Sequence, residues 1–285
     1  MSKKLTESQR QEIIAKYLSN KYSTKDLAKE YDICLSTVCR LLNKNNISLR
    51  NSRFNFNQDY FEIIDTEHKA YWLGFMYADG YVNSKVNTVS LRIKKDDDYI
   101  LKQFAKDLDS NIPIKYYSST HKLPSSDKIH TLNYASITIC NKKIKKDLIK
   151  QGCFDNKTLI LNFPFHIPNH LYKDFIRGYM DGDGCITYCG KQKCGIQEFK
   201  VSFCGTQEML NGIQKIFDYN KKLGKRWNNN KNNYTLDISG NRQVYNFLTT
   251  LYDNATIYLE RKYERYLELK NILSLPPVME AEITT

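Results

Sequence analysis

Two aspartates occupy the same place in two similar stretches of the chain. Asp79 lies in AYWLGFMYADGYV (70–82), and Asp183 lies 104 residues later in DFIRGYMDGDGCI (174–186). A single Asp-Gly pair indicates only a turn, but two carboxylates held close together repel each other unless a cation lies between them. Mg²⁺ favours carboxylate, carbonyl and water ligands. Paired metal sites can stabilise the attacking and leaving oxygens of phosphodiester hydrolysis.

Small residues before each aspartate predict how the two could be brought together. Gly74 and Ala78 are four residues apart, as are Gly178 and Gly182, and residues i and i+4 share one face of a helix. Glycine inside a helix costs about 1 kcal/mol relative to alanine, so its use in both stretches favours two closely packed helix backbones. We expect these helices to place the aspartates side by side, with the following glycine letting each chain turn sharply.

A lysine follows each aspartate at a matched distance. Lys157 in GCFDNKT and Lys262 in YLERKY are 105 residues apart. An ammonium group there could orient a water molecule and offset the negative charge that builds on a phosphate. The alternative is a pair of surface lysines in a lysine-rich chain, and the matched spacing favours the functional interpretation.

The elements that must position these residues also repeat, with a period near 104 residues. Asn141 and Asn241, each after a strand-like stretch, are 100 residues apart. Each copy predicts a helix, two strands, a helix, two strands and a helix. The second helices are expected near 99–108 and 207–218, and the third at 141–151 and 241–252.

The predicted strands alternate between apolar and polar residues, for example at 89–94 and 199–203. The apolar face of each sheet should lie on its helices. The other face would carry Ser90, Arg92, Lys94, Ser136, Thr138, Lys200, Ser202, Thr235 and Asp237. Such a face suits a nucleic acid groove, although alternation alone indicates no more than an ordinary solvated sheet.

The first 50 residues predict a small all-helical unit. Thr6 can cap a helix that runs to Leu18, Ser23 or Thr24 can cap a second helix, and a third carries apolar residues around Val38. Residues 1–53 hold eleven Lys and Arg against five Asp and Glu, half of the excess charge of the whole chain. A basic three-helix unit favours nucleic acid binding over simple packing.

The segment DLAKEYDICLSTVCRLL within this unit resembles a helix-turn-helix DNA-binding motif. Ala28 stands where the two helices touch, Ile33 follows the turn and Val38 lies in the second helix. Asp32 replaces the usual turn glycine, although aspartate tolerates the left-handed conformation, and Cys34 replaces a common serine cap. The resemblance implies groove contacts from Ser36, Thr37, Arg40, Asn43 and Lys44.

Charge, hydropathy and cysteine spacing favour some classes of protein over others. The 285 residues carry a net charge of +12 with a mean hydropathy of −0.58, and no apolar run predicts a membrane span or signal peptide. We therefore expect a cytoplasmic or organellar protein that is not secreted, with phosphate-rich partners. Eight cysteines include Cys185, Cys189, Cys194 and Cys204, but their spacings match no common zinc site and favour small structural thiols.

The stretches WLGFMYADG (72–80) and IRGYMDGDG (176–184) resemble the two motifs of single-chain LAGLIDADG homing endonucleases. The resemblance covers roughly residues 70–270 and extends to motif order, spacing and repeat length. It implies a monomeric endonuclease from a mobile genetic element that cuts both strands of a long, asymmetric DNA site with Mg²⁺ or Mn²⁺. It also implies an α+β fold in which two pseudo-symmetric αββαββα repeats form a saddle over the DNA.

The family's metal ligands map onto residues of this chain. The eighth motif position, the metal-binding acid, falls on Asp79 and Asp183. The seventh, which lends a backbone carbonyl, falls on Ala78 and Gly182. The first motif departs from the family at its sixth position, where Tyr77 replaces aspartate, but that position is not a metal ligand.

The resemblance also assigns catalytic roles outside the motifs. Lys157 and Lys262 fit the basic residue that the family places late in each repeat, near the hydrolytic water. Lys95 resembles a further polar position near the first centre. The second repeat has Cys204 and Gly205 there, with no such side chain, so the two centres are expected to be unequal.

Strand and loop residues would read the DNA under this interpretation. The candidates are Asn83, Lys85, Asn87, Arg92, Lys94, Lys191, Gln192, Lys193, Lys200, Lys225, Arg226 and Asn228. The expected organisation is a helix-turn-helix domain at 1–50, a linker at 51–69, repeats at 70–168 and 169–275, and a tail at 276–285. Two alternatives on the same fold stay open: an RNA-binding intron maturase and a DNA-binding transcription regulator.

Overall fold

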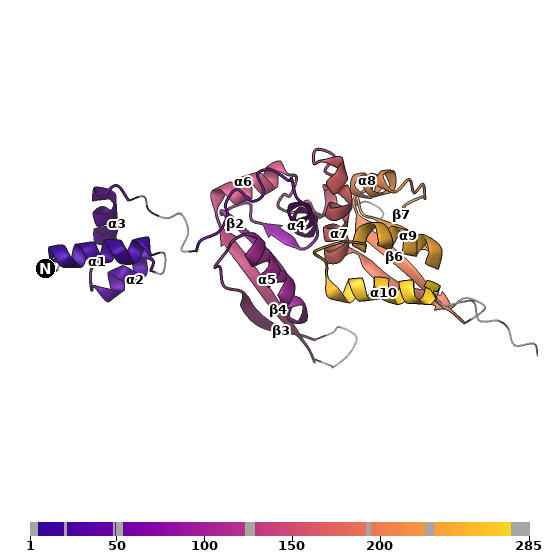
Figure 1. Cartoon of the computed structure of the whole chain (residues 1–285), viewed down its shortest axis with the longest axis horizontal. Coiled ribbons are helices and arrows are strands. Elements are labelled where there is room, and N and C mark those ends of the chain that lie inside the picture. The colour runs from indigo at the N-terminus through magenta and orange to yellow at the C-terminus, as the bar shows by residue number, and fades with distance from the viewer. Residues whose placement is uncertain are drawn as a thin grey trace, which may run out of the picture. The chain divides into compact units, whose positions relative to one another are not determined.

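The computed structural model describes residues 5–19, 22–47, 49, 54–122, 129–191, 195–225 and 231–274. Contacts divide the chain into two compact units, and each is described by itself. The first comprises Met1–Asn57 with Leu108–Pro113, and the second comprises Gln58–Asp107 with Ile114–Thr285. Figure 1 labels their helices and strands. No helix in the described ranges is long and apolar enough to cross a membrane.

Three helices make up the first unit: α1 (Glu7–Leu18), α2 (Thr24–Glu30) and α3 (Leu35–Lys44). Thr6 and Ser23 cap α1 and α2 as expected, each accepting a hydrogen bond from the backbone N–H three residues on. In both caps the side chain of that third residue bonds back to the cap's own backbone, which satisfies two otherwise free N–H groups.

The turn between α2 and α3 explains how the unusual residues are tolerated. Asp32 adopts the left-handed conformation, with φ of 51°, in place of the usual glycine. Cys34 occupies the cap position of α3 without a side-chain hydrogen bond to the backbone, and its sulfur instead contacts the hydroxyls of Ser36 and Thr37. The core beneath the turn consists of Ile13, Tyr17, Leu27, Ala28, Val38 and Leu42.

The second unit contains two copies of the expected helix–strand–strand–helix–strand–strand–helix order. The first copy is α4 (Glu67–Ala78), β1 (Gly80–Val82), β2 (Thr88–Lys94), α5 (Asp98–Asp107), β3 (Lys115–Lys122), β4 (Ile129–Cys140) and α6 (Lys142–Lys150). The second copy is α7 (Tyr172–Asp183), β5 (Cys185–Lys191), β6 (Gln197–Gly205), α8 (Gln207–Ile216), β7 (Gly224–Lys225), β8 (Tyr234–Ser239) and α9 (Asn241–Tyr252).

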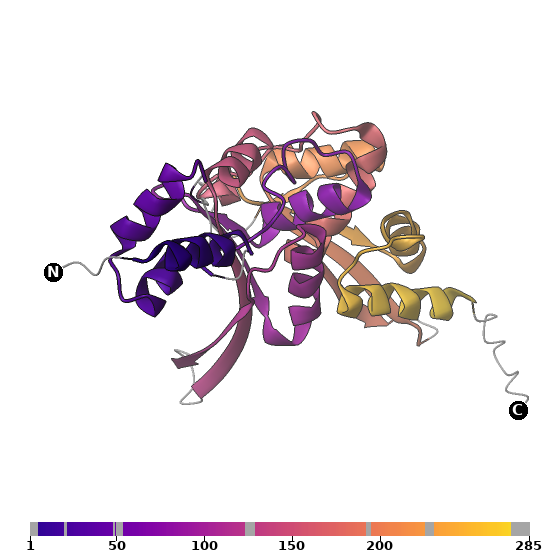
Figure 2. The ribbon, with the colours of Figure 1, turned by 60° about the vertical axis from the view of Figure 1, so that its left-hand side comes forward.

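A further helix, α10 (Glu260–Ser274), follows the second copy and was not predicted. Its buried residues are Lys262, Tyr266 and Leu269, so a charged residue belongs to the buried face of this helix. Figure 2 shows α9 and α10 (gold) together beside the second sheet. Because α10 carries Lys262, its presence changes the interpretation of the second centre.

Each copy folds into a four-stranded antiparallel sheet, with strand orders β1-β2-β4-β3 and β5-β6-β8-β7. The predicted alternation holds: Val89, Leu91 and Ile93 of β2 are buried, and Arg92 and Lys94 are exposed. Ser136 is an exception on the polar face. It is buried on an inner strand, with Arg92 and Lys115 as its cross-strand partners.

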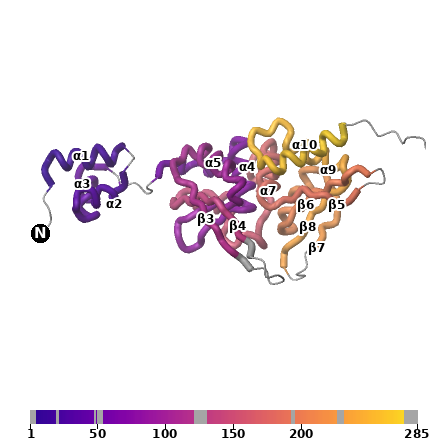
Figure 3. The backbone as a smooth tube through the Cα atoms, turned by 90° about the horizontal axis from the view of Figure 1, so that it is seen from below, coloured from indigo at the N-terminus to yellow at the C-terminus, as the bar shows by residue number. Residues whose placement is uncertain are grey.

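Helices α4 and α7 pack against each other between the two sheets (Figure 3). A Cβ on Gly74 would overlap the Phe175 carbonyl, and a Cβ on Gly178 would overlap the Tyr71 carbonyl. The small-residue stripes therefore let backbone meet backbone, as the sequence predicted. All residues from 70 to 77 of α4 are buried, so this helix has no polar face after its first turn.

Polar groups buried on α7 are satisfied by hydrogen bonds. Arg177, which is 1% exposed, pairs with Asp174 at 2.9 Å and with Glu67 at 2.6 Å. It also donates to the carbonyls of Leu251 and Ile257. A buried guanidinium is tolerated only when its donors are used in this way, so Arg177 fixes α7 against the start of α4 and the segment before α10.

Candidate active site

Asp79 and Asp183 lie at the ends of the two packed helices. Asp79 is the residue that follows the last turn of α4, and Asp183 is the last residue of α7. The backbones are adjacent at this end, since a Cβ on Gly182 would overlap the Cβ of Ala78. Each of the two residues is exposed at the surface, although enough protein surrounds its carboxyl group for burial to raise its pKa.

Burial and neighbouring charges shift the pKa values of both aspartates. Burial by surrounding protein and the nearby Asp183 carboxylate together raise the pKa of Asp79 to about 6, against the opposing effect of Lys262, Lys157 and Arg261. Burial also raises the pKa of Asp183, opposed first by Lys157 and then by Lys262. Two oxygen ligands whose negative charges oppose each other are suited to a cation placed between them.

Removing the carboxylate of Asp79, which the Asp183 carboxylate repels, should stabilise the metal-free protein. The folded-state pKa of Asp79 lies above its ordinary value of 3.8, so this group makes folding less favourable as pH rises from about 4 to about 6. Asp79→Asn should raise the melting temperature at pH 7 by only about 2 °C, because an exposed charge is screened. The gain should disappear below pH 4 in thermal denaturation monitored by circular dichroism. An equal gain at both pH values would show that the charge of Asp79 does not destabilise the fold. Asp65→Asn is the control.

Both predicted lysines reach the turn that follows their own aspartate. Lys157 donates a hydrogen bond to the carbonyl of Gly80. Lys262 donates to the carbonyls of Met180, Asp181 at 2.8 Å and Gly184 at 2.6 Å. Lys262 is only 4% exposed, and burial lowers its pKa to about 8. The matched contacts of the two lysines agree with their matched spacing, and they add a positioning role to the predicted charge.

The glycines after the aspartates serve a different purpose from the one predicted. Gly184 has φ of −73°, and Gly80 is likewise not among the described glycines with positive φ. The requirement is for space, because a Cβ would overlap the backbone and side chain of Met76 at Gly80, and of Met180 at Gly184. The chain leaves each helix by passing close over its last turn.

The residue two places before each aspartate holds the lysine-bearing segment, a feature that sequence reasoning missed. The Tyr77 hydroxyl donates to the Gln151 carbonyl at 2.6 Å, six residues before Lys157. The Asp181 carboxylate accepts from the Leu259 N–H at 2.7 Å, three residues before Lys262. Hydroxyls of Tyr71 and Tyr252 also donate to Asp181. At the sixth motif position, Tyr77 and Asp181 thus each hydrogen-bond to the segment that leads to the lysine of their own copy, although the two side chains differ.

Loss of the tyrosine hydroxyl should weaken the first of these contacts. Tyr77→Phe leaves the Gln151 carbonyl without its donor and should cost about 1 kcal/mol in the free energy of unfolding measured with urea. Tyr60→Phe is the matched control, because the buried Tyr60 hydroxyl has no hydrogen-bond partner in the described part of the chain. Equal losses in the two variants would show that the Tyr77 hydrogen bond contributes nothing specific.

An open pocket of about 260 Å³ begins at Asp79. It is lined by residues of both copies: Phe75, Asp79, Arg92, Ile93, Lys94, Asp97, Tyr134, Asp181, Leu259 and Arg261. Arg92 and Lys94, predicted to bind DNA, thus lie near the first aspartate. Lys95 is exposed in the short helix η1 (Lys95–Asp97) and is not among the lining residues. The catalytic role of Lys95 stays a prediction.

The structure distributes the other DNA-binding candidates over exposed turns and strand ends. Asn83, Lys85 and Asn87 lie in the turn between β1 and β2, where the Asn83 side chain accepts two backbone hydrogen bonds. Lys191 and Lys225 are exposed at the ends of β5 and β7. Lys200 on β6 pairs with Asp237 at 3.5 Å. Gln192, Lys193, Arg226 and Asn228, with the tail at 276–285, lie outside the described residues.

The candidates on α3 occupy its solvent side. Ser36, Arg40, Asn43 and Lys44 are exposed, and Thr37 is partly buried. Groove contacts from this helix stay a prediction.

The structure describes three of the four clustered cysteines, and Cys194 lies outside the described residues. Cys185 and Cys189 are exposed on β5, and Cys204 is partly buried on β6. Within the ranges described, no three His, Cys, Asp or Glu residues are grouped so that they could hold a metal. Two carboxylates therefore leave coordination positions for backbone carbonyls, water and substrate, a set that hard divalent cations accept.

Neither a family model nor a curated protein sequence matches the chain. Solved structures similar to it include the LAGLIDADG homing endonuclease I-GzeII in complex with its DNA target, at 11% identity and a TM-score of 0.47, over 72% of this chain and 88% of that one. The LAGLIDADG meganuclease I-AabMI bound to uncleaved DNA has 12% identity and a TM-score of 0.46, over 73% and 91%. I-SmaMI bound to cleaved DNA has 14% identity and a TM-score of 0.44, over 74% and 90%. Likeness at this level does not assign the chain to the family.

Proposed function

We propose that this protein is a metal-dependent, site-specific DNA endonuclease of the LAGLIDADG homing type that cuts both strands of its target. The observation that carries the proposal is the aspartate pair. Asp79 and Asp183 end two helices whose glycine stripes bring backbone against backbone, and nearby negative charge helps to raise the pKa of Asp79. An accessible pair of carboxylates in this state favours a divalent cation and a phosphodiester substrate.

The residues present fit Mg²⁺ or Mn²⁺ bound by Asp79 and Asp183, with the carbonyls of Ala78 and Gly182 as further ligands. A bound cation would stabilise charge on the scissile phosphate and lower the pKa of an attacking water. Lys157 and Lys262 hold the turns that follow the aspartates, and their ammonium groups offset negative charge at both carboxylates. The exposed Arg92 and Lys94 would bind phosphates or bases beside this centre.

The experiment starts from a target that is not yet known. Purified full-length protein would select duplexes from a randomised DNA library in Ca²⁺, and the enriched duplexes would then be incubated with Mg²⁺ or Mn²⁺. We expect both strands to be cut at defined positions, and EDTA to prevent cutting. Duplexes that are bound but left intact with either metal would contradict the proposal and favour a transcription regulator. Selective binding of structured RNA without DNA cleavage would favour a maturase.

The first unit is proposed to add DNA contacts through α3, as a helix-turn-helix domain. The basic residues Arg40 and Lys44 are exposed on this helix. Replacing both by alanine in the full chain should weaken DNA binding and reduce the slope of log K against log salt by about 2, since each lost phosphate contact removes about 1. Lys29→Ala on α2 is the control, and an unchanged slope in the double variant would exclude the contact.

A further inference from the structure

Arg261 connects the two copies directly beside the aspartate pair. It is the second residue of α10, and its Nε donates to the Asp97 carboxylate of the first copy at 3.1 Å. It lines the pocket that contains Asp79 and also a second open pocket of about 530 Å³ that begins at Gly184 and Cys185. No motif or repeat match had singled out this residue.

The guanidinium is held at one nitrogen and available at the others. Arginine has five N–H donors in a rigid plane, and the hydrogen bond recorded for Arg261 in the described part of the chain uses Nε alone. The Asp97 side chain is 12% exposed, whereas that of Arg261 is 53% exposed. A carboxylate thus fixes the plane of the guanidinium while its outer edge faces solvent, the arrangement that suits bidentate binding of a phosphate.

The pocket linings place this charge beside the first aspartate. Arg261 and Asp79 both line the pocket of about 260 Å³, together with Asp97. Asp183 is not among the lining residues of this pocket or of the second one. The guanidinium therefore shares a pocket with one carboxylate of the pair.

The first copy has no equivalent cation. The residue 105 positions before Arg261 is Asn156, which adopts a left-handed conformation with φ of 51°. It precedes the short helix η2 (Lys157–Leu159), where the second copy has the 15-residue helix α10. This is a second difference between the copies, besides the one expected at Lys95.

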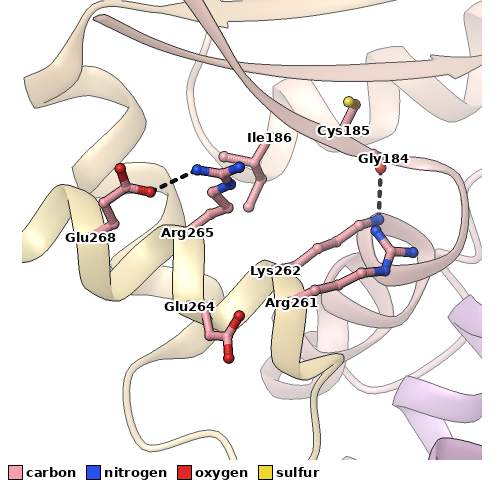
Figure 4. Close-up of a pocket in the computed structure, with 8 residues that line it drawn as sticks. All are labelled: Gly184, Cys185, Ile186, Arg261, Lys262, Glu264, Arg265 and Glu268. Atoms are coloured by element: carbon pink, nitrogen blue, oxygen red, sulfur yellow. Dashed lines mark hydrogen bonds and ion pairs between the residues drawn. The ribbon is translucent and has the colours of Figure 1, made fainter. Parts of the chain in front are cut away.

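Arg265, one turn further along α10, lines the same second pocket but is already engaged. Its Nη1 pairs with Glu268 at 2.8 Å, and its guanidinium lies 4.5 Å from the centre of the Tyr188 ring. Figure 4 shows Arg265 directed towards Glu268, whereas Arg261 extends alongside Lys262. Arg265 is therefore a matched control from the same helix face.

We propose that Arg261 is a phosphate-binding residue that contacts the DNA backbone at the Asp79 side of the site only, and that it makes the two strands unequal substrates. The proposal rests on the endonuclease function proposed above. Asp97 is the positioning residue that fixes the orientation of the guanidinium. The ligand class is a phosphodiester of duplex DNA.

Strand-resolved cleavage tests the proposal. The selected duplex would carry a different fluorophore on each strand, and single-turnover rates with Mg²⁺ would be measured for each strand separately. Arg261→Ala should slow one strand by about 10- to 100-fold, the effect of losing a hydrogen-bonded charge, and leave the other within about threefold. Arg261→Lys should recover part of the loss, and Asp97→Asn should give a smaller loss on the same strand. Arg265→Ala should leave both rates within about threefold of wild type.

The outcomes separate this inference from the proposed function. Equal slowing of both strands by Arg261→Ala, or none, would overturn the inference while leaving the endonuclease intact. If wild type cut neither strand, the endonuclease proposal would fail, and a binding measurement in Ca²⁺ would still decide the role of Arg261. Loss of a phosphate contact should reduce the salt slope by about 1, and an unchanged slope would exclude it.

Discussion

Asp79→Asn is expected to abolish cleavage of both strands, with single-turnover rates reduced by about 10³-fold or more, the order found when a group that stabilises transition-state charge is lost. Asp183→Asn should have the same effect. The reason is that, under the proposed mechanism, each substitution removes one of the two carboxylates that would hold the metal, and the charge of Asp183 already affects Asp79. Cleavage of the selected duplex with Mg²⁺ is the measurement.

Binding should survive these substitutions, which distinguishes lost chemistry from lost folding. In Ca²⁺ each asparagine variant should bind the duplex within about threefold of wild type, because removing negative charge beside a phosphate does not weaken attraction to DNA. Asp65→Asn, which removes an exposed carboxylate paired with Lys69, is the control for net charge. Full cleavage by the Asp79→Asn, Asp183→Asn double variant would overturn the mechanism.

Gly74→Ala is expected to destabilise the protein by about 3 kcal/mol, the upper part of the usual range for overpacking a close contact. The added methyl group would overlap the Phe175 carbonyl, which is backbone of the opposing helix and cannot rotate away. Gly178→Ala should behave alike, because its methyl group would meet the Tyr71 carbonyl. Urea denaturation of each variant measures the change.

The sign of this effect is informative, because glycine to alanine within a helix normally stabilises by about 1 kcal/mol. Lys106→Ala, at an exposed position of α5, is the control for introducing alanine into a helix. A gain in stability at Gly74 or Gly178 would show that α4 and α7 do not touch as described. A variant that folds but separates the helices should also lose cleavage of both strands together, since each aspartate depends on the other.

The repeated elements and the aspartate pair were predictable because their signals are local and occur twice. Gly74 and Gly178, each with a small residue four positions later, predict close contact between two helix backbones. The spacing of Lys157 and Lys262 marks the end of each copy. The structure confirms the order of helices and strands and the contact between the two glycine stripes. The catalytic roles of the lysines stay predictions.

What escaped prediction depends on contacts between distant segments. The Tyr77–Gln151 and Asp181–Leu259 hydrogen bonds join residues more than 70 positions apart, and their side chains differ, so no repeated residue type marks them. Arg261 meets Asp97 across 164 positions. Helix α10 was missed because its buried face is built around a lysine. The shared sixth motif position of Tyr77 and Asp181 could have predicted that these two residues make equivalent contacts.

The contact between α4 and α7 has a consequence for redesign. The approach of α4 to α7 is set by close contacts of Gly74 and Gly178 with main-chain carbonyls, and of Gly182 with the Cβ of Ala78. If the protein binds DNA as proposed, surface residues of β2 and β6 could be exchanged to alter sequence preference without changing the contact between the helices. Recognition and cleavage would then depend on separate parts of the fold.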